Sequence, residues 1–280
     1  MGDEHRMTAT RISIVTPSFN QAPFVEQTIK SIIGQDYPNL EYVVIDGGST
    51  DGSDDIISRY RSYLHHYVSE PDAGHADALN KGFRHTTGEI MAWLNSDDMY
   101  LPGTFRTVAE LFDQNPDIHW LVGTKGFFND RGTLMFTKKV NKNLADFLSG
   151  HYGWIQQESV FWRRSLWERA GGHVDETYKF MVDGELWCRF FTLEKLWHVN
   201  CVLSGYRIHK RNRGVVYRKE CEEEMKRAIG DLRRHADATR LSATETGYPT
   251  LRYDFAKSAW TRVVVPRISA RPQTSPGLLR

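Results

Sequence analysis

The 280-residue sequence is poor in cysteine and has no excess of charge of either sign. Its three cysteines, Cys188, Cys201 and Cys221, are odd in number and unclustered, which argues against a disulfide framework or a zinc site. The 36 basic and 35 acidic residues nearly cancel, so the chain lacks the basic surplus of proteins that coat nucleic acid. We therefore predict reduced thiols in the core of a cytoplasmic protein that has no nucleic-acid partner.

Long apolar runs are also missing. No stretch reaches the roughly 18 to 20 apolar residues that a membrane-spanning helix needs. Residues 1–10 are polar and lack the apolar core of a secretion signal, so we expect a flexible N-terminus there. The predicted location is cytoplasmic, with peripheral contact to the inner face of the cell membrane as an alternative. Residues 260–268 mix tryptophan, arginine and aliphatic residues as interfacial segments do, but a helix or strand packed on the domain is the simpler interpretation.

Strand-like and helix-like segments alternate over the first hundred residues. Short apolar runs predict strands at 12–16, 42–45, 67–69 and 90–94. Between them, residues 24–33 carry apolar side chains on one helical face and end at Gly34. A second helix is expected behind the capping side chains of 51–54, and a shorter one at 76–83. This alternation predicts an α/β fold with a mainly parallel sheet flanked by helices.

The alternation weakens from Trp120 onward. Two antiparallel strands are expected near 121–123 and 133–136, joined by a turn at 129–132, and they predict a small second sheet. The remaining expected elements are a strand at 160–162, a helix from Ser165, a helix around 185–193 and a charged helix at 218–235. A tail rich in arginine, proline and serine follows.

No internal repeat and no long low-complexity linker divides the chain. We expect one catalytic domain over residues 11–215, with a nucleotide-binding half at 11–100 and an acceptor-binding half at 101–215. Residues 216–280 are expected to form a C-terminal helical extension and tail.

Polar residues follow each of the four early strands, at 16–20, 46–48, 70–72 and 95–98. The carboxyl ends of parallel strands meet at one edge of a sheet, which is where ligands bind in such folds. Asp97 and Asp98 end the fourth strand, and paired carboxylates suit an oxygen-ligated divalent cation held against phosphates. Two neighbouring aspartates also suit a solvated turn or a helix N-cap, because Pro102 follows and could open a helix.

Taken together, the motifs resemble a known family. They are IVTPSFN at 14–20, VIDGGSTDG at 44–52, SEPDAG at 69–74, NKG at 80–82, TGEI at 87–90 and NSDD at 95–98. Their order and spacing are similar to those of the inverting family 2 glycosyltransferases of GT-A fold, over residues 11–213. The resemblance implies a nucleotide-sugar donor, a glycan or polyprenyl-linked glycan acceptor, and a divalent cation, Mn²⁺ or Mg²⁺. It also implies a role in polysaccharide biosynthesis for the cell envelope.

The resemblance assigns a metal site. Asp97 takes the position of the principal metal ligand and Asp98 is its neighbour beside the nucleotide. Asn95 stands where the family usually carries a first aspartate, so we expect modest metal affinity. A later strand is expected to return Arg207 and His209 toward the diphosphate, with His209 as a further metal or phosphate contact. The alternative is that His209 is an ordinary histidine of the surface or core.

The resemblance also assigns a nucleotide site. Asp46 matches the acid that reads the base, and Gly47 replaces a second acid often found beside it, which leaves the base open. The predicted nucleotide-binding residues are Pro17, Ser18, Asn20, Asp46, Asp72, Lys81 and Asp98. The first three equally suit a plain strand-to-helix turn. Lys81 is the nearest cation because Leu79 replaces the arginine of many relatives, although a solvated helix residue is an equally simple interpretation.

Inversion needs a base that takes the proton of the acceptor hydroxyl. Asp183 falls on the catalytic acid of the family motif, while Val182 replaces the usual glutamate. Asp183 could also be the N-cap of the following helix, and Glu185 is the alternative base. Trp154 and Gln157 are expected to contact the acceptor, since aromatic faces stack on sugars and amides bond hydroxyl groups.

Two other functions remain open from the sequence. A nucleotidyltransferase generally places a glycine-rich, basic loop after its first strand, and residues 19–23 carry neither feature. A decayed sugar- or nucleotide-binding module would explain the departures at Asn95, Gly47, Leu79 and Val182. The donor sugar, the acceptor linkage and the oligomeric state are not assigned by any motif.

Overall fold

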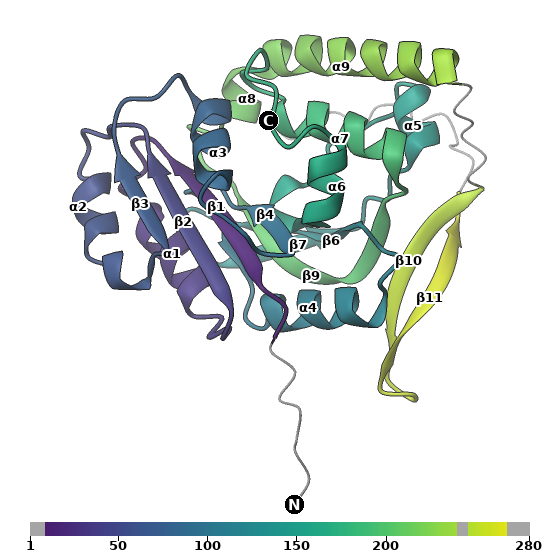
Figure 1. Cartoon of the computed structure of the whole chain (residues 1–280), viewed down its shortest axis with the longest axis horizontal. Coiled ribbons are helices and arrows are strands. Elements are labelled where there is room, and N and C mark those ends of the chain that lie inside the picture. Colours follow the sequence, from purple (N-terminus) through teal and green to yellow (C-terminus); the bar gives the residue numbers. More distant parts are fainter. Residues whose placement is uncertain (1–8, 240–245, 268–280) are drawn as a thin grey trace, which may run out of the picture.

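The structure is a computed structural model that describes residues 9–239 and 246–267. The predicted flexible N-terminus and the arginine-rich tail lie largely outside these residues. Eleven strands form one mixed sheet in the order β11-β10-β9-β6-β8-β4-β1-β2-β3, with β5 paired to β9 and β7 paired to β6. The α/β architecture, with a largely parallel sheet between helices, is the predicted one (Figure 1).

The first half follows the predicted alternation. Its strands are β1 (Ile12–Ser18), β2 (Leu40–Asp46), β3 (His66–Ser69) and β4 (Ile90–Trp93), and they pair with one another in parallel. Its helices are α1 (Val25–Ile33), α2 (Ser53–Ser58), the 3₁₀ turn η1 (Arg61–Tyr63) and α3 (His75–Phe83). Helix α3 packs closely on β1 because Gly82 has no side chain: a Cβ there would lie 2.4 Å from Val15 Cγ1.

The middle of the chain adds strands of both directions. Its elements are β5 (Met99–Tyr100), α4 (Thr104–Gln114), β6 (Trp120–Phe128), β7 (Leu134–Lys138), α5 (Leu144–Leu148), η2 (Gln157–Ser159), β8 (Val160–Arg163), α6 (Arg164–Arg169), α7 (Val182–Leu193) and β9 (Trp197–Arg207). The antiparallel strands were expected to form a separate small sheet, but they belong to the main one. The reason is β8, which pairs antiparallel with both β4 and β6 and so joins the two halves.

Asp97 and Asp98 do not cap a helix. They precede β5, and α4 begins only at Thr104 behind Gly103, whose φ of +82° favours glycine. The helix-cap alternative is therefore excluded, and the two aspartates form a loop at the end of β4.

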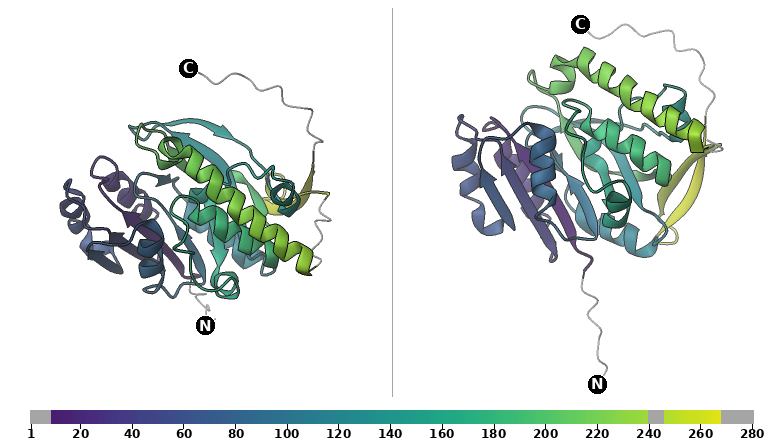
Figure 2. Two further views of the ribbon diagram at one scale, coloured as in Figure 1. Left: turned by 90° about the horizontal axis from the view of Figure 1, so that it is seen from above. Right: turned by 45° about the horizontal axis from the view of Figure 1, so that its top comes forward.

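The C-terminal segment shares the core of the domain. It contains α8 (Arg213–Val216), the long α9 (Arg218–Thr239) and the hairpin of β10 (Gly247–Asp254) and β11 (Ala259–Pro266). Helix α9 packs on α7 and buries Cys221, Met225 and Ile229, while β10 pairs with β9 (Figure 2). Residues 260–266 of the segment with interfacial character belong to strand β11, and Trp260 packs there against Tyr253. None of the described helices has the length and apolar character to cross a bilayer.

A cluster of tryptophans fills the junction between the two halves. Trp93 of β4 stacks on Trp187 of α7 at 5.7 Å, and Trp162 of β8 meets Trp93 edge-on at 5.5 Å. All three side chains are fully buried. Large aromatic rings bury much apolar area and prefer such edge and offset contacts, so this cluster fixes α7 against the sheet.

We expect Trp162→Ala to lower the free energy of unfolding by about 3–5 kcal/mol, because the lost indole leaves a cavity in a close-packed core. The control Phe255→Ala removes a ring that is 87% exposed at the hairpin tip, and should change stability by less than about 0.5 kcal/mol. Urea denaturation followed by far-ultraviolet circular dichroism measures both. Equal losses in the two variants would contradict the assignment of this cluster as the core.

Candidate active site

The candidate site lies where the carboxyl ends of several strands meet. Strands β4 and β6 both run antiparallel to β8, so they are parallel to each other, and β9 is parallel to β6. The end of β9 therefore reaches the same edge of the sheet as the ends of β1, β2 and β4. This brings Asp97, beyond β4, next to His209, beyond β9.

Asp97 and His209 form the centre of this edge. The Oδ2 atom of Asp97 lies 2.9 Å from Nε2 of His209. The Nδ1 atom of His209 accepts the backbone N–H of Arg211 at 3.2 Å, so Nε2 carries the proton and donates to Asp97. The imidazole ring lies 4.6 Å from the ring of Phe24. The two residues predicted as metal ligands are thus brought together.

The donor set fits a cation that is shared with a substrate. Among the described residues, no group of three histidine, cysteine, aspartate or glutamate side chains is placed to hold a metal. Mg²⁺ and related ions are commonly held by one or two carboxylates together with substrate phosphates and water. The carboxylate of Asp97 meets that requirement, and Nε2 of His209 could add a nitrogen in the other tautomer, in which Nδ1 carries the proton and no longer accepts from Arg211.

Asp98 has a different environment from its neighbour. Its side chain is buried, and Oδ1 accepts the backbone N–H of Arg207 at 2.8 Å. Burial and the nearby carboxylates of Asp97 and Glu158 raise the pKa of Asp98 well above its ordinary value. Asp98 was predicted to contact the nucleotide, but its side chain is turned into the protein and holds β9 instead.

Arg207 fixes the loop that carries both aspartates. Its guanidinium is buried, with Nε donating to the carbonyl of Asp97 at 2.6 Å and Nη1 donating to Gln27 Oε1 at 2.8 Å and the carbonyl of Asp130 at 3.1 Å. It also lies over the ring of Phe24 at 5.0 Å. Arg207 was expected to reach the diphosphate, but its side chain is buried and its Nε and Nη1 atoms bond the protein, which makes it a positioning residue.

On the nucleotide side, Asp46 is buried and shapes its own loop. Its carboxylate accepts the N–H and hydroxyl of Ser49 at 2.8 and 2.6 Å and the hydroxyl of Ser69 at 2.8 Å. Asp72 is partly exposed beside it, and burial raises its pKa. A Cβ at Gly47 would lie 2.8 Å from Asp72 Oδ2, so glycine at this position lets Asp72 approach. Of the two predicted acids, Asp72 is the one open to a ligand.

The other predicted nucleotide residues line the first loop. Pro17 and Ser18 are buried at the end of β1. Asn20 Oδ1 accepts the N–H of Thr50 at 2.9 Å, which ties this loop to the one after β2.

Lys81 lies 3.2 Å from both Glu70 and Asp77, so its ammonium group is already in ion pairs. That arrangement agrees with the alternative of an ordinary helix residue.

Asp183 lies on the acceptor side, in the first turn of α7. The N-cap of this helix is Met181, so Asp183 does not cap it. Burial raises the pKa of Asp183 to about 6, although backbone amides oppose the shift. Glu185, the alternative base, accepts two hydrogen bonds of 2.7 Å from the guanidinium of Arg189. Asp183 is therefore the available carboxylate of this helix.

Gln157 supports the metal-side loop and is not free for an acceptor. It is buried, its Nε2 donates to the carbonyl of Trp93 at 2.6 Å, and its Oε1 accepts from Asn95 Nδ2 at 3.3 Å. Asn95 Oδ1 in turn lies 3.1 Å from Nε2 of His75. Trp154, by contrast, is 42% exposed, as a residue that stacks on a sugar should be.

Two residues near Asp183 have no counterpart in the predicted site. Glu158 is buried, and burial together with Asp183 raises its pKa to about 7. Burial lowers the pKa of Lys125 to about 8, and its Nζ donates to the carbonyl of Trp154. Glu158 directly follows the predicted residue Gln157, but Lys125 lies in mid-strand, where only strand pairing reveals its neighbours.

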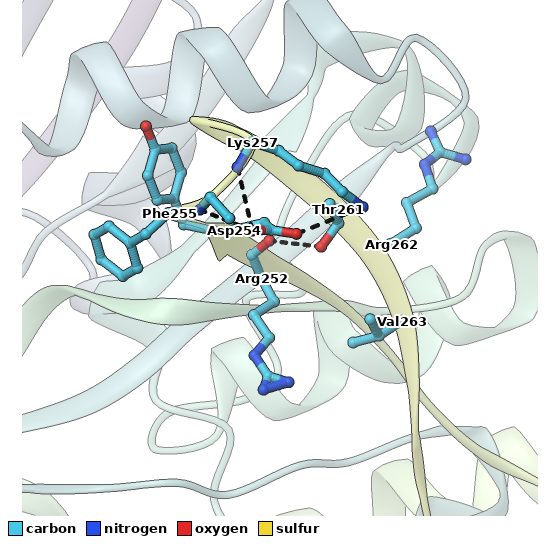
Figure 3. Close-up of a pocket in the computed structure, with 9 residues that line it drawn as sticks. Arg252, Asp254, Phe255, Lys257, Thr261, Arg262 and Val263 are labelled. Carbon is cyan, nitrogen blue, oxygen red and sulfur yellow. Dashed lines mark hydrogen bonds and ion pairs between the residues drawn. The ribbon is translucent and has the colours of Figure 1, made fainter.

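A hollow at the other end of the sheet is separate from this site. It lies beside the tip of the β10–β11 hairpin, where Asp254 is 3.5 Å from Lys257 (Figure 3). The hairpin and the nucleotide-side strands β1 to β3 lie at opposite ends of the strand order. The hollow therefore takes no part in the chemistry of the strand ends.

Comparison with known proteins gives a consistent result. Residues 13–196 match the model of the family described as glycosyl transferase family 2. An uncharacterised glycosyltransferase of Mycobacterium tuberculosis is 28% identical over 240 residues, covering 83% of this chain and 86% of its own. Another from Rickettsia typhi is 26% identical over 210 residues, covering 71% of this chain and 64% of its own, so this chain spans slightly less than two thirds of that protein.

Two solved structures share the fold. Staphylococcus aureus TarS 1-349 in complex with UDP has a TM-score of 0.62 and 19% identity, covering 81% of this chain and 68% of its own. The mannosyltransferase PcManGT from Pyrobaculum calidifontis, in complex with GDP-Man and Mn²⁺, has a TM-score of 0.58 and 23% identity, covering 85% and 67%.

We expect Arg207→Met to lower the free energy of unfolding by about 3–5 kcal/mol, because it leaves the carbonyls of Asp97 and Asp130 and the amide oxygen of Gln27 without a donor, at about 1–3 kcal/mol for each buried group. Arg252→Met is the matched control, since Arg252 is exposed at the hairpin, and it should cost less than about 0.5 kcal/mol. Urea denaturation measures both variants. A small loss for Arg207→Met would show that the loop of Asp97 is held by other contacts.

Proposed function

The chain belongs to glycosyl transferase family 2, and we propose that it moves a sugar from a nucleotide-diphosphate donor to a hydroxyl group of a glycan or lipid-linked glycan, with inversion. The chain is a glycosyltransferase of GT-A fold. The observation that carries the finer proposal is the shared edge of the sheet. Support comes from the pair of Asp97 and His209 at this edge and from Asp183, which is the carboxylate of α7 without an arginine partner.

On the donor side, we assign a divalent cation, Mn²⁺ or Mg²⁺, to Asp97 and His209. When bound, such an ion neutralises the charge that grows on the diphosphate leaving group. Asp97 is pre-organised for this role, because the buried Arg207 holds its backbone carbonyl. Support comes from the carboxylate–imidazole geometry and from the Mn²⁺ and GDP-Man bound to PcManGT.

On the acceptor side, Asp183 is the proposed general base. The acceptor oxygen attacks the anomeric carbon, the bond from that carbon to the phosphate oxygen breaks, and the hydroxyl proton passes to Asp183. A carboxylate whose pKa is raised to about 6 is ionised at neutral pH and is a stronger base than an ordinary aspartate. The nearby Glu158 is the less suitable base, because it is buried more completely.

The donor assignment predicts cation-dependent nucleotide binding. We expect UDP or GDP with Mn²⁺ to stabilise the protein by about 2.7 kcal/mol at a ligand concentration of about 100 times Kd. Asp97→Asn should lose the Mn²⁺-dependent part, because the variant lacks the charged ligand, whereas Asp130→Asn, on an exposed turn, should keep it. Thermal-shift titrations measure this effect. No response to any nucleoside diphosphate would overturn the proposed donor.

The base assignment predicts a pH profile and a large rate loss. We expect kcat/KM to rise with pH through about 6 and then level, because the raised pKa keeps Asp183 protonated and inactive below that value. Asp183→Asn should lower kcat by about 10²- to 10⁴-fold. Glu185→Gln is the control and should keep most activity, since that carboxylate serves Arg189. Intact transfer by Asp183→Asn would remove the residue from the mechanism, and no transfer by the wild-type protein would favour a decayed binding module.

A further inference from the structure

Three lysines gather on the acceptor side of the sheet, next to Trp154. Lys125 of β6 and Lys138 of β7 are direct cross-strand partners, which places their Cβ atoms about 5 Å apart. Lys125 donates to the carbonyl of Trp154. Lys142 donates to the carbonyl of His151, and its Nζ would lie 3.1 Å from a Cβ at Gly153. We call Lys125, Lys138 and Lys142 the lysine cluster.

The lysine cluster lacks close counter-charges. Among the described residues, none of its three members has a carboxylate within 4 Å, whereas Lys30, Lys81 and Lys257 do. Like charges opposite each other on paired strands are destabilising. The acids that act on Lys125 at longer range are Glu158 and Asp183. Burial and Asp183 raise the pKa of Glu158 to about 7, so it offers less than a full negative charge near neutral pH. Asp183 lies near Lys125 and Asp146 near Lys142, and each offsets part of the charge of the three lysines, so the cluster keeps a net positive charge without a close ion pair.

Aromatic rings border the same face of the sheet. Side chains two residues apart on a strand share a face, so Phe127 lies on the face of Lys125 and Phe136 on the face of Lys138. These two rings stack at 4.5 Å, and Tyr206 lies 6.5 Å from Phe127. The exposed faces of such rings, with Trp154 nearby, suit the CH surface of a sugar.

We propose that the lysine cluster binds an anionic group of the acceptor, a phosphate or a carboxylate, beside the hydroxyl group that Asp183 deprotonates. Lysine serves as a point charge for either group. The proposal rests on the proposed function, because it assigns the acceptor class of the same site. Such a group has two sources: the phosphate of a lipid carrier, or an acidic sugar of the growing glycan.

The test uses the whole protein, titrated by calorimetry with UDP or GDP and Mn²⁺ present, so that the donor phosphate sites are filled. Three probes are compared: decyl phosphate, an unsaturated uronic-acid disaccharide, and neutral decyl glucoside. We expect at least one anionic probe to bind, and Lys138→Gln to weaken that binding by about tenfold, which is about 1.4 kcal/mol. Lys138 is exposed, so the variant should fold.

Lys139→Gln is the matched control. Lys139 follows β7 and points the other way, with its Nζ 3.4 Å from Asn200 Oδ1, so this variant should bind like the wild type. Binding of decyl phosphate identifies a lipid phosphate, and binding of the disaccharide identifies an acidic glycan.

Three results would overturn the proposal: no binding of either anionic probe, equal binding of decyl glucoside and decyl phosphate without a charge preference, or equal effects of Lys138→Gln and Lys139→Gln. The same titrations, repeated without nucleotide, distinguish a failure of this inference from a failure of the proposed function. A protein that binds nucleotide but shows no lysine-dependent anion binding keeps the proposed function and loses this inference. A protein that shows lysine-dependent anion binding but no response to any nucleotide keeps this inference and loses the proposed function.

Discussion

The buried guanidinium of Arg207 is the contact on which the geometry of the site depends. A buried arginine needs partners for its N–H groups, and Nε and Nη1 of Arg207 find them in three segments that are distant in sequence. These are the carbonyl of Asp97, the carbonyl of Asp130 and the side chain of Gln27 on α1. The loop after β4, the turn between β6 and β7, and the first helix are therefore fixed against β9. His209 follows two residues later, which is why it meets Asp97.

The acids of the site differ in how deeply they are buried, and this difference separates their roles. Asp97 and Asp98 are adjacent in the chain, yet one faces His209 and the other is enclosed against β9. On the acceptor side, burial raises the pKa of both Asp183 and Glu158, and only Asp183 remains partly exposed. Carboxyl groups of one chemical type thus become a proposed cation ligand, a structural anchor and a proposed base because their surroundings differ.

The sequence predicted what depends on local pattern. The four early strands and the helices between them follow from short apolar runs and helical spacing, so β1 to β4 and α1 to α3 lie close to their expected positions. The single mixed sheet was not predictable, because it depends on β8 pairing with β4 and β6 across long stretches of chain. The same limit applies to side chains. The motif NSDD does not reveal that the side chain of Asp98 turns inward. The residues around Gln157 do not reveal that its amide is bonded to Trp93 and Asn95.

The two halves of the site also differ in how their chemistry is encoded. The donor half uses residues at strand ends, where a few neighbouring positions set the geometry, and the family model includes all of these positions up to residue 196, which leaves out Arg207 and His209. The acceptor half is assembled by pairing. The place of Lys125 in the site becomes clear only from its cross-strand partner Lys138 and from its hydrogen bond to the carbonyl of Trp154. A cluster of this kind leaves no motif, since any strand may carry a lysine. Its signature is physical: a partly buried cation beside two others, without a close carboxylate, next to the acid that would accept the proton. For this reason the proposed class of acceptor rests on charge and packing, whereas the proposed class of donor rests on motifs.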